Sequence, residues 1–152
     1  MKPWRDGVRA LLLDPDDRVL LVHFSFPPHP WAPPGGGTEP GETDEQALGR
    51  ELAEEVGLDE FELGPLLWTR EHHFDVPARF LGQRERCYLV AVERFEPVPR
   101  LDLAAEGVDD VRWWTSAEME STDEVFGPRG LPGLVRELLD HGPPLQPRRI
   151  GK

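Results

Sequence analysis

The chain has very little cysteine, lysine and tyrosine, and it has no long apolar run. Cys87 is the only cysteine in 152 residues, which excludes an internal disulfide and fits a reducing compartment. Its apolar sequence neighbours are typical of a buried structural thiol rather than a nucleophile. No stretch approaches the ~20 apolar residues that a membrane helix needs, and the first residues lack the apolar core of a signal peptide. These absences predict a cytoplasmic protein with no membrane partner.

Positive charge is also scarce. The chain has 17 basic and 29 acidic residues, which gives a net charge of −12. Proteins that bind nucleic acid in general, or a membrane surface, are usually basic, so both classes of partner are disfavoured. A nucleotide substrate stays compatible, because a bound metal changes the local field. The length suits one domain, which we expect over residues 1–141, followed by a flexible Pro- and Arg-rich tail over 142–152.

What the chain does contain is a glycine-rich segment that runs directly into a well-signalled helix. Residues 35–37 are all glycine, which predicts a loop whose backbone a ligand can approach closely. Thr43 is a good N-cap, and Gln46 three positions later completes a capping box. Gly57 is the residue type that ends a helix. The helix is therefore predicted to begin near Thr43 and to end before Gly57.

Three carboxylates stand beside the apolar stripe of this helix. Glu51, Glu54 and Glu55 have the i, i+3, i+4 spacing that places side chains on one face. Unpaired, they repel one another at the edge of a core. Arg50 can offset one of them, whereas a divalent cation would offset all three, and such oxygen ligands suit Mg²⁺ or Mn²⁺. The alternative is a solvated acidic helix face with no ligand.

This stretch resembles the signature of the nudix hydrolases, Gly-x5-Glu-x7-Arg-Glu-(apolar)-x-Glu-Glu-x-Gly-(apolar). The motif is long and specific, and the surrounding layout resembles the family over most of residues 5 to 141. Pro33 departs from the family, which usually has an apolar residue there. All nine specified positions are filled, by Gly36, Glu42, Arg50, Glu51, Leu52, Glu54, Glu55, Gly57 and Leu58.

The remaining pattern predicts a mixed sheet with helices packed on it, which the resemblance sharpens to a nudix-type α/β/α sandwich, an α+β or α/β fold. The resemblance also implies a metal-dependent hydrolase that cleaves a diphosphate linkage in a nucleoside diphosphate joined to another group. Mg²⁺ is the expected cofactor, with Mn²⁺ as an option, and a homodimer is compatible with the family. We expect strands over 8–13, 19–24, 66–68, 71–76, 84–95 and 111–114, and further helices over 115–119 and 131–141.

Carried over position by position, the resemblance implies a role for each motif residue. Glu51, Glu54 and Glu55 are metal ligands, joined by the carbonyl of Gly35. Glu51 or another nearby glutamate, such as Glu54, is the catalytic base. Arg50 orients Glu51.

The rest of the motif supports these groups. Glu42 fixes the loop or pairs with Arg50, in the second shell of the metal. Gly36 and Gly37 bring the backbone close to the substrate. Trp31, just before the glycines, either stacks on a base or packs under the loop.

A further carboxylate often comes from a later loop in this family. Glu106 is the candidate, because it lies in the loop that enters the strand containing Trp113; Asp109 and Asp110 are rivals, and each is equally consistent with a solvated acidic loop. Glu85 contacts the site or forms a salt bridge at a strand end.

Two adjacent histidines and two competing functions complete the sequence evidence. His72 and His73 suit a structural role, and at most one of them enters a given site, because neighbouring strand residues point to opposite faces. A nucleotide-sensing module without turnover is the main alternative function, although it would tolerate loss of the carboxylates. An isoprenoid diphosphate isomerase would need a cysteine in the site, which the apolar setting of Cys87 disfavours.

Overall fold

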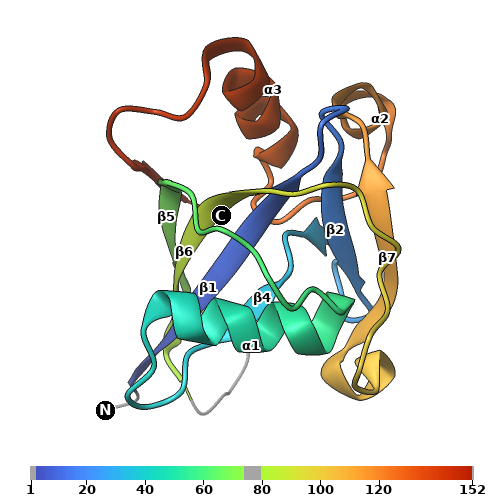
Figure 1. The fold of residues 1–152 in the computed structure, drawn as a ribbon. Coiled ribbons are helices and arrows are strands. Elements are labelled where there is room, and N and C mark those ends of the chain that lie inside the picture. Colours follow the sequence, from blue (N-terminus) through green and yellow to red (C-terminus); the bar gives the residue numbers. More distant parts are fainter. Residues whose placement is uncertain (1–2, 74–79, 152) are drawn as a thin grey trace.

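A computed structural model describes residues 3–73 and 80–151 of the chain. These residues form a mixed sheet of eight strands with the path β3-β2-β1-β6-β5-β8, while β4 pairs with β1 and β7 pairs with β2 (Figure 1). The strands are β1 (Trp4–Leu13), β2 (Val19–Phe24), β3 (Trp31–Ala32), β4 (Gly35–Gly37), β5 (Leu66–His73), β6 (Gly82–Ala91), β7 (Val108–Trp114) and β8 (Arg148–Ile150). The helices are α1 (Asp44–Val56), the 3₁₀ turn η1 (Leu103–Glu106), α2 (Ser116–Ser121) and α3 (Leu131–His141).

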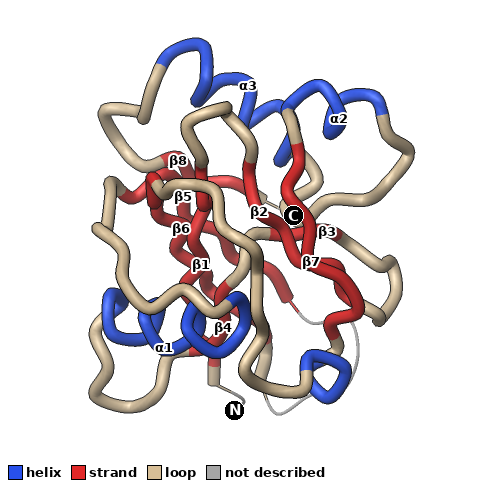
Figure 2. Tube along the Cα trace, turned by 45° about the vertical axis from the view of Figure 1, so that its right-hand side comes forward, coloured by secondary structure: helices blue, strands red, loops and turns tan. Residues whose placement is uncertain are grey.

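The sheet is covered on both faces, which confirms the predicted sandwich. Alternate residues of β1 point to opposite sides: Val8 and Leu12 pack with Leu48 and Leu52 of α1. On the other side, Leu11 packs with residues of α2 and α3. Figure 2 shows α1 on one side of the strands and α2 and α3 on the other. The two cores therefore anchor α1 against the central strands, where the predicted site residues lie.

Helix α1 begins and ends as predicted. The Thr43 hydroxyl accepts a hydrogen bond from the Gln46 backbone N–H, and the Gln46 side chain accepts one from the Thr43 N–H. Gly57 closes the helix with a φ of 76°, in the left-handed region that favours glycine. Local residues therefore set both ends of α1, the helix that carries the three glutamates.

Three short strands were not predicted. The glycine segment, expected as a loop, is extended and pairs antiparallel with β1, with Gly35 opposite Arg9 and Gly36 opposite Val8. Residues 31–32 form β3 beside β2. Within the expected tail, Arg148–Ile150 forms β8 parallel to β5. The two strands predicted over 66–68 and 71–76 are a single strand as far as His73, and the rest of that prediction lies outside the described residues.

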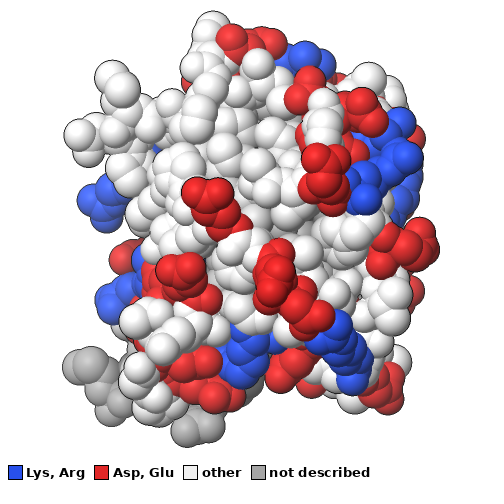
Figure 3. All heavy atoms as spheres, viewed as in Figure 1, with Lys and Arg blue, Asp and Glu red and all other residues white. Residues whose placement is uncertain are grey.

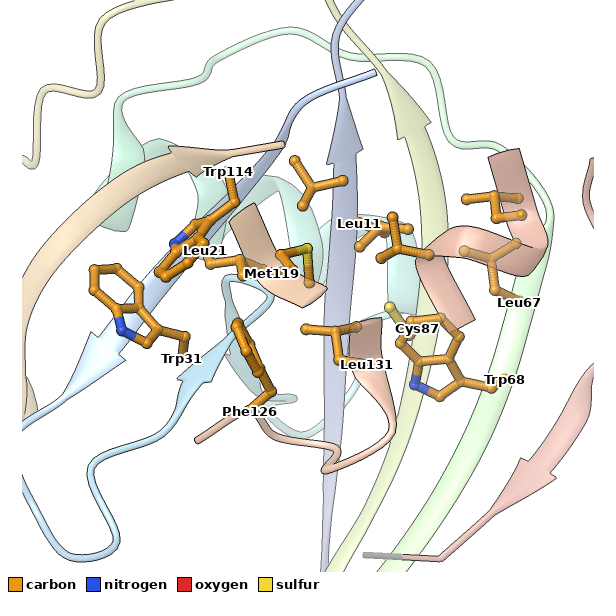
Figure 4. Packing of buried hydrophobic residues seen from close by; sticks show 13 residues of the cluster. Leu11, Leu21, Trp31, Leu67, Trp68, Cys87, Trp114, Met119, Phe126 and Leu131 are labelled. Carbon is orange, nitrogen blue, oxygen red and sulfur yellow. The ribbon is translucent and has the colours of Figure 1, made fainter. Parts of the chain in front are cut away.

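Trp31 lies in the core, which is the second of its two expected roles. Its side chain is 4% exposed, and its ring meets Trp114 edge-on at 5.2 Å between centroids. Figure 4 shows it packed near Leu21, Trp114 and Phe126. A stacking platform needs an open ring face, so the structure does not support Trp31 as a base-stacking residue.

Candidate active site

Glu51 and Glu55 of the predicted site meet the glycine strand where α1 packs against β4. Glu55 is buried, with 8% of its surface exposed, and its Oε1 accepts a hydrogen bond from the Gly35 N–H at 3.3 Å. Gly36 lies against Glu51, since a Cβ on Gly36 would stand 2.6 Å from the Glu51 carboxyl group. Figure 3 shows acidic side chains gathered on the α1 side of the molecule with arginines among them. Two of the three motif carboxylates therefore abut the glycine strand directly.

Electrostatics link these carboxylates to one another. Burial raises the pKa of Glu55 to about 7, and although Arg9 opposes this rise, the negative charges of Glu51 and Glu106 add to it. Burial likewise raises the pKa of Glu51, with Arg50 acting against it and Glu54 adding to it. Two carboxylates with raised pKa values, close to further negative charge, are typical of a site that binds a cation.

Arg50 lies at the centre of a hydrogen-bond network beside Glu51. Its Nε and Nη2 donate to both oxygens of Glu42 at 2.9 Å, Nη1 donates to Glu51 Oε1 at 2.8 Å, and Nη2 donates to the Gly37 carbonyl at 3.0 Å. The hydrogen bond from Arg50, with a second from the Glu39 backbone, lowers the pKa of Glu42 to about 2. Arg50 thus ties the helix, the loop and the glycine strand together, and pairing with Arg50 was one of two roles expected of Glu42.

We expect Arg50→Gln to lower turnover by roughly 10- to 100-fold, as is typical when a partner that orients a metal ligand is lost. The shortened side chain cannot make the four hydrogen bonds that hold Glu42, Glu51 and Gly37 together. Arg50→Lys should rescue little, because an ammonium group lacks the planar fork that binds a carboxylate through two donors. Steady-state rates at saturating Mg²⁺ test this, with Arg136→Gln on the exposed face of α3 as the control. Full activity in both Arg50 variants would contradict the assigned role.

The three candidate carboxylates of the later loop, Glu106, Asp109 and Asp110, have different partners in the structure. Glu106 acts electrostatically on Glu55. Asp109 lies 2.5 Å from His23 Nδ1, and Asp110 accepts a hydrogen bond from the Val111 backbone N–H. Of the three candidates, Glu106 is the one whose charge acts on Glu55, and its part in the site stays a prediction.

Glu85 does not pair with its sequence neighbours at a strand end. It is 4% exposed and bonds instead to Arg9 and Arg70 on the two adjacent strands. Arg84 and Arg86 point to the opposite face, because side chains alternate along a strand. Glu85 is therefore a salt-bridge residue near the beginning of β6, which was one of the two roles expected of it.

The side chains of His72 and His73 have different neighbours, as expected for adjacent residues of a strand. His72 Nε2 lies 3.8 Å from Glu85 Oε1, whereas the ring of His73 packs on Trp4 at 4.9 Å between centroids. Sequence reasoning missed Arg9, which donates to the Pro33 carbonyl at 2.9 Å and acts on Glu55. The sequence offered one indication of a role for Arg9: it is the only arginine in an otherwise apolar predicted strand, residues 8–13.

The donor set suits a hard divalent cation by its chemistry. Among residues 3–73 and 80–151, no three acidic, histidine or cysteine side chains already stand in a ligand arrangement. The carboxylates of Glu51, Glu54 and Glu55 nevertheless supply the oxygen donors that Mg²⁺ and Mn²⁺ prefer. The raised pKa of buried Glu55 shows that its negative charge is under-compensated by the protein alone. These residues fit a metal ion, and Glu55 is the ligand that would gain most from one.

Metal-free protein should lose stability between about pH 4.5 and pH 7 through Glu55. Its pKa rises from 4.5 in the ordinary state to about 7 in the fold, so the folded state binds the proton more tightly. Its contribution is present below pH 4.5 and is lost as pH rises through 7. At about 1.4 kcal/mol per pKa unit, the difference is roughly 3 kcal/mol.

Urea unfolding of the wild type and Glu55→Gln in EDTA, at pH 5 and pH 7.5, measures this loss. Relative to the wild type, Glu55→Gln should have a higher free energy of unfolding at pH 7.5 than at pH 5. A difference that is the same at both pH values would contradict the burial of an unpaired carboxylate.

Comparison with known proteins identifies relatives in sequence and in structure. The family model for the NUDIX domain, which describes the sequences of that family, matches residues 3–131 of this chain. An RNA pyrophosphohydrolase of Legionella pneumophila (strain Corby) is 36% identical over 121 residues, which cover 72% of this chain and 69% of that protein. An RNA pyrophosphohydrolase of Yersinia enterocolitica is 40% identical over 97 residues, covering 57% of this chain and 55% of that protein.

Solved structures share the fold. The NUDIX domain of Shewanella oneidensis NrtR, crystallised with ADP ribose, superposes with a TM-score of 0.67 at 27% identity and covers 91% of this chain and 90% of that one. A NUDIX hydrolase from Nitrosomonas europaea gives a TM-score of 0.72 at 19% identity, covering 100% of this chain and 81% of that one. Among the described residues, no helix combines the length and the apolar character needed to span a bilayer.

Proposed function

The chain belongs to the nudix hydrolase family, and we propose that it is a divalent-metal-dependent hydrolase. Its substrate is a nucleoside diphosphate linked to another group, and the bond cleaved is a diphosphate linkage. One observation carries the proposal: buried Glu55 is held against the glycine strand with Glu51 and Glu106 acting on it. The relatives named RNA pyrophosphohydrolase support the bond type.

In this proposal the helix glutamates and the glycine strand have separate tasks. Glu51, Glu54 and Glu55, with the Gly35 carbonyl, would hold Mg²⁺ or Mn²⁺. The bound ion would neutralise phosphate oxygens and make water a better nucleophile. Gly36 and Gly37 lack side chains, so the substrate can approach the backbone.

The proton of the attacking water goes to a glutamate. Glu51 is suited to accept it, because burial raises its pKa above the ordinary value while Arg50 fixes the position of its carboxyl group. Glu54 and Glu106 are the other glutamates within the same set and are the alternative bases. Glu42 keeps Arg50 in place and has no direct part in the reaction.

A nucleotide-sensing module is the second candidate, because the similar NrtR domain was crystallised with ADP ribose. Such a module would bind the nucleotide and leave it intact. The motif carboxylates favour turnover, since sensing alone does not need the whole set. A cytoplasmic location and a homodimer stay predictions from the sequence.

A substrate panel tests the proposed function. Nucleoside triphosphates, ADP-ribose, dinucleoside polyphosphates, NADH and 5′-triphosphorylated RNA are each incubated with Mg²⁺ or Mn²⁺, and released phosphate and pyrophosphate are measured. We expect metal-dependent cleavage of at least one compound, and none in EDTA. Tight binding measured by calorimetry without cleavage of any compound would replace hydrolysis with sensing.

A further inference from the structure

A buried cluster of charged residues lies on the sheet face opposite α1. Glu85 of β6 accepts hydrogen bonds from Arg9 of β1 at 3.2 Å and from Arg70 of β5 at 3.3 Å, and from Gln83 at 2.7 Å. The side chains of Arg9 and Arg70 each keep 14% of their surface exposed, whereas Glu85 keeps 4%. Both arginine side chains are therefore largely buried and keep a small part of their surface exposed.

The cluster carries more positive than negative charge. Two guanidinium groups share the single carboxylate of Glu85. Among the described residues, Arg70 Nε is buried and finds no hydrogen-bond acceptor. Arg5 adds a third cation, since its Nη1 donates to Gln83 Oε1 at 3.1 Å. A buried surplus charge with an unused donor is costly unless an anion completes it.

The cluster borders the candidate active site. Arg9 donates to the carbonyl of Pro33, which precedes the glycine strand. Arg5 lies against that strand, because a Cβ on Gly37 would stand 2.7 Å from its Nε. Arg9 also acts electrostatically on Glu55, and Arg5 on Glu51. The cluster is thus linked through Arg9 to Glu55, one of the carboxylates on the other side of the glycine strand.

We propose that Arg9 and Arg70 form a subsite for a phosphate group of the substrate that lies outside the cleaved linkage. The inference rests on the proposed function and narrows its substrate class. A guanidinium group binds phosphate oxygens through two donors, and the exposed part of the Arg9 and Arg70 side chains is where such a group would approach. Glu85 holds both guanidinium groups in position, but its single negative charge cannot neutralise two positive charges. Substrates with three or more phosphates are favoured over ADP-ribose or NADH, which have two.

The first test measures inorganic phosphate binding in EDTA, by calorimetry and by the shift in melting temperature at constant ionic strength with chloride. Wild-type protein should bind phosphate and be stabilised by it. Arg70→Gln should bind at least tenfold more weakly, and Arg100→Gln, which alters an exposed arginine paired with Asp59, should bind like the wild type. Arg70→Lys keeps the charge without the fork, so it should also bind more weakly and covers the case in which Arg70→Gln fails to fold. Equal binding by the wild type and Arg70→Lys, or no binding by the wild type, would overturn the subsite.

The second test separates a phosphate of the substrate from free phosphate. Arg70→Lys should raise the KM for a triphosphate substrate about tenfold with kcat within twofold, and leave the KM for a substrate with two phosphates unchanged. An equal rise for both substrates would overturn the assignment to an additional phosphate. Glu55→Gln keeps the cluster, so it should bind phosphate while losing turnover. Phosphate binding by a wild type that cleaves nothing leaves the subsite standing and overturns only the proposed hydrolysis.

Discussion

Glu55→Gln is expected to lower kcat for the accepted substrate by roughly 1,000-fold. A metal ion contributes several kcal/mol of transition-state stabilisation, and each 1.36 kcal/mol is a factor of ten in rate. The glutamine is the same size and keeps an oxygen that can accept the hydrogen bond from the Gly35 N–H. It loses the negative charge, so the cation is held less tightly.

The control for this prediction is Glu45→Gln, which removes the same charge from an exposed position in the first turn of α1. It should leave kcat within about twofold, and circular dichroism should show that both variants fold. If Glu55→Gln cleaves the substrate as fast as Glu45→Gln does, the buried carboxylate has no part in catalysis.

Adjacent glycines should respond in opposite ways to an added methyl group. Gly35→Ala should destabilise the fold by about 3 kcal/mol or more, because Gly35 has a φ of 151° and its Cβ would stand 2.0 Å from the Val8 carbonyl oxygen. In Gly36→Ala the Cβ meets the movable carboxyl end of Glu51 at 2.6 Å. That variant should lose about 1 kcal/mol or less, yet turn over about tenfold more slowly, because Glu51 is displaced.

Urea unfolding and steady-state kinetics on the two variants measure this contrast. Gly133→Ala in α3 is the matched control: nothing lies within 4 Å of its Cβ position, and alanine in a helix interior is favoured by about 0.5–1 kcal/mol. A stable Gly35→Ala protein, or a Gly36→Ala protein with the full wild-type rate, would contradict the geometry of the glycine strand.

The elements that the sequence predicted well are those set by neighbouring residues. Helix α1 follows from its cap, its apolar stripe and Gly57, all within fourteen positions of one another. Strand β2 and helix α3 match their predicted bounds for the same reason. Strands β4 and β8 were missed because their pairing depends on partners far along the chain, and no local pattern encodes such a partner.

The same limit applies to the site. The set from Glu42 to Glu55 was found because the motif is contiguous. The burial of Trp31 depends on its contacts with Trp114 and Phe126, which lie about 80 to 95 positions further along the chain. The Arg9–Glu85–Arg70 cluster joins three strands and has no sequence signature, so it required the sheet register.

Manganese binding tests most directly whether the α1 carboxylates form a metal site. Mn²⁺ is titrated into the wild type, Glu54→Gln, Glu55→Gln and Glu45→Gln, with the free ion followed by electron paramagnetic resonance and Mg²⁺ added as competitor. Bound Mn²⁺ that Mg²⁺ displaces, with affinity at least tenfold lower in Glu54→Gln and Glu55→Gln and unchanged in Glu45→Gln, is the predicted result. Equal affinity in all four proteins would contradict a metal site on this helix and the hydrolytic mechanism built on it.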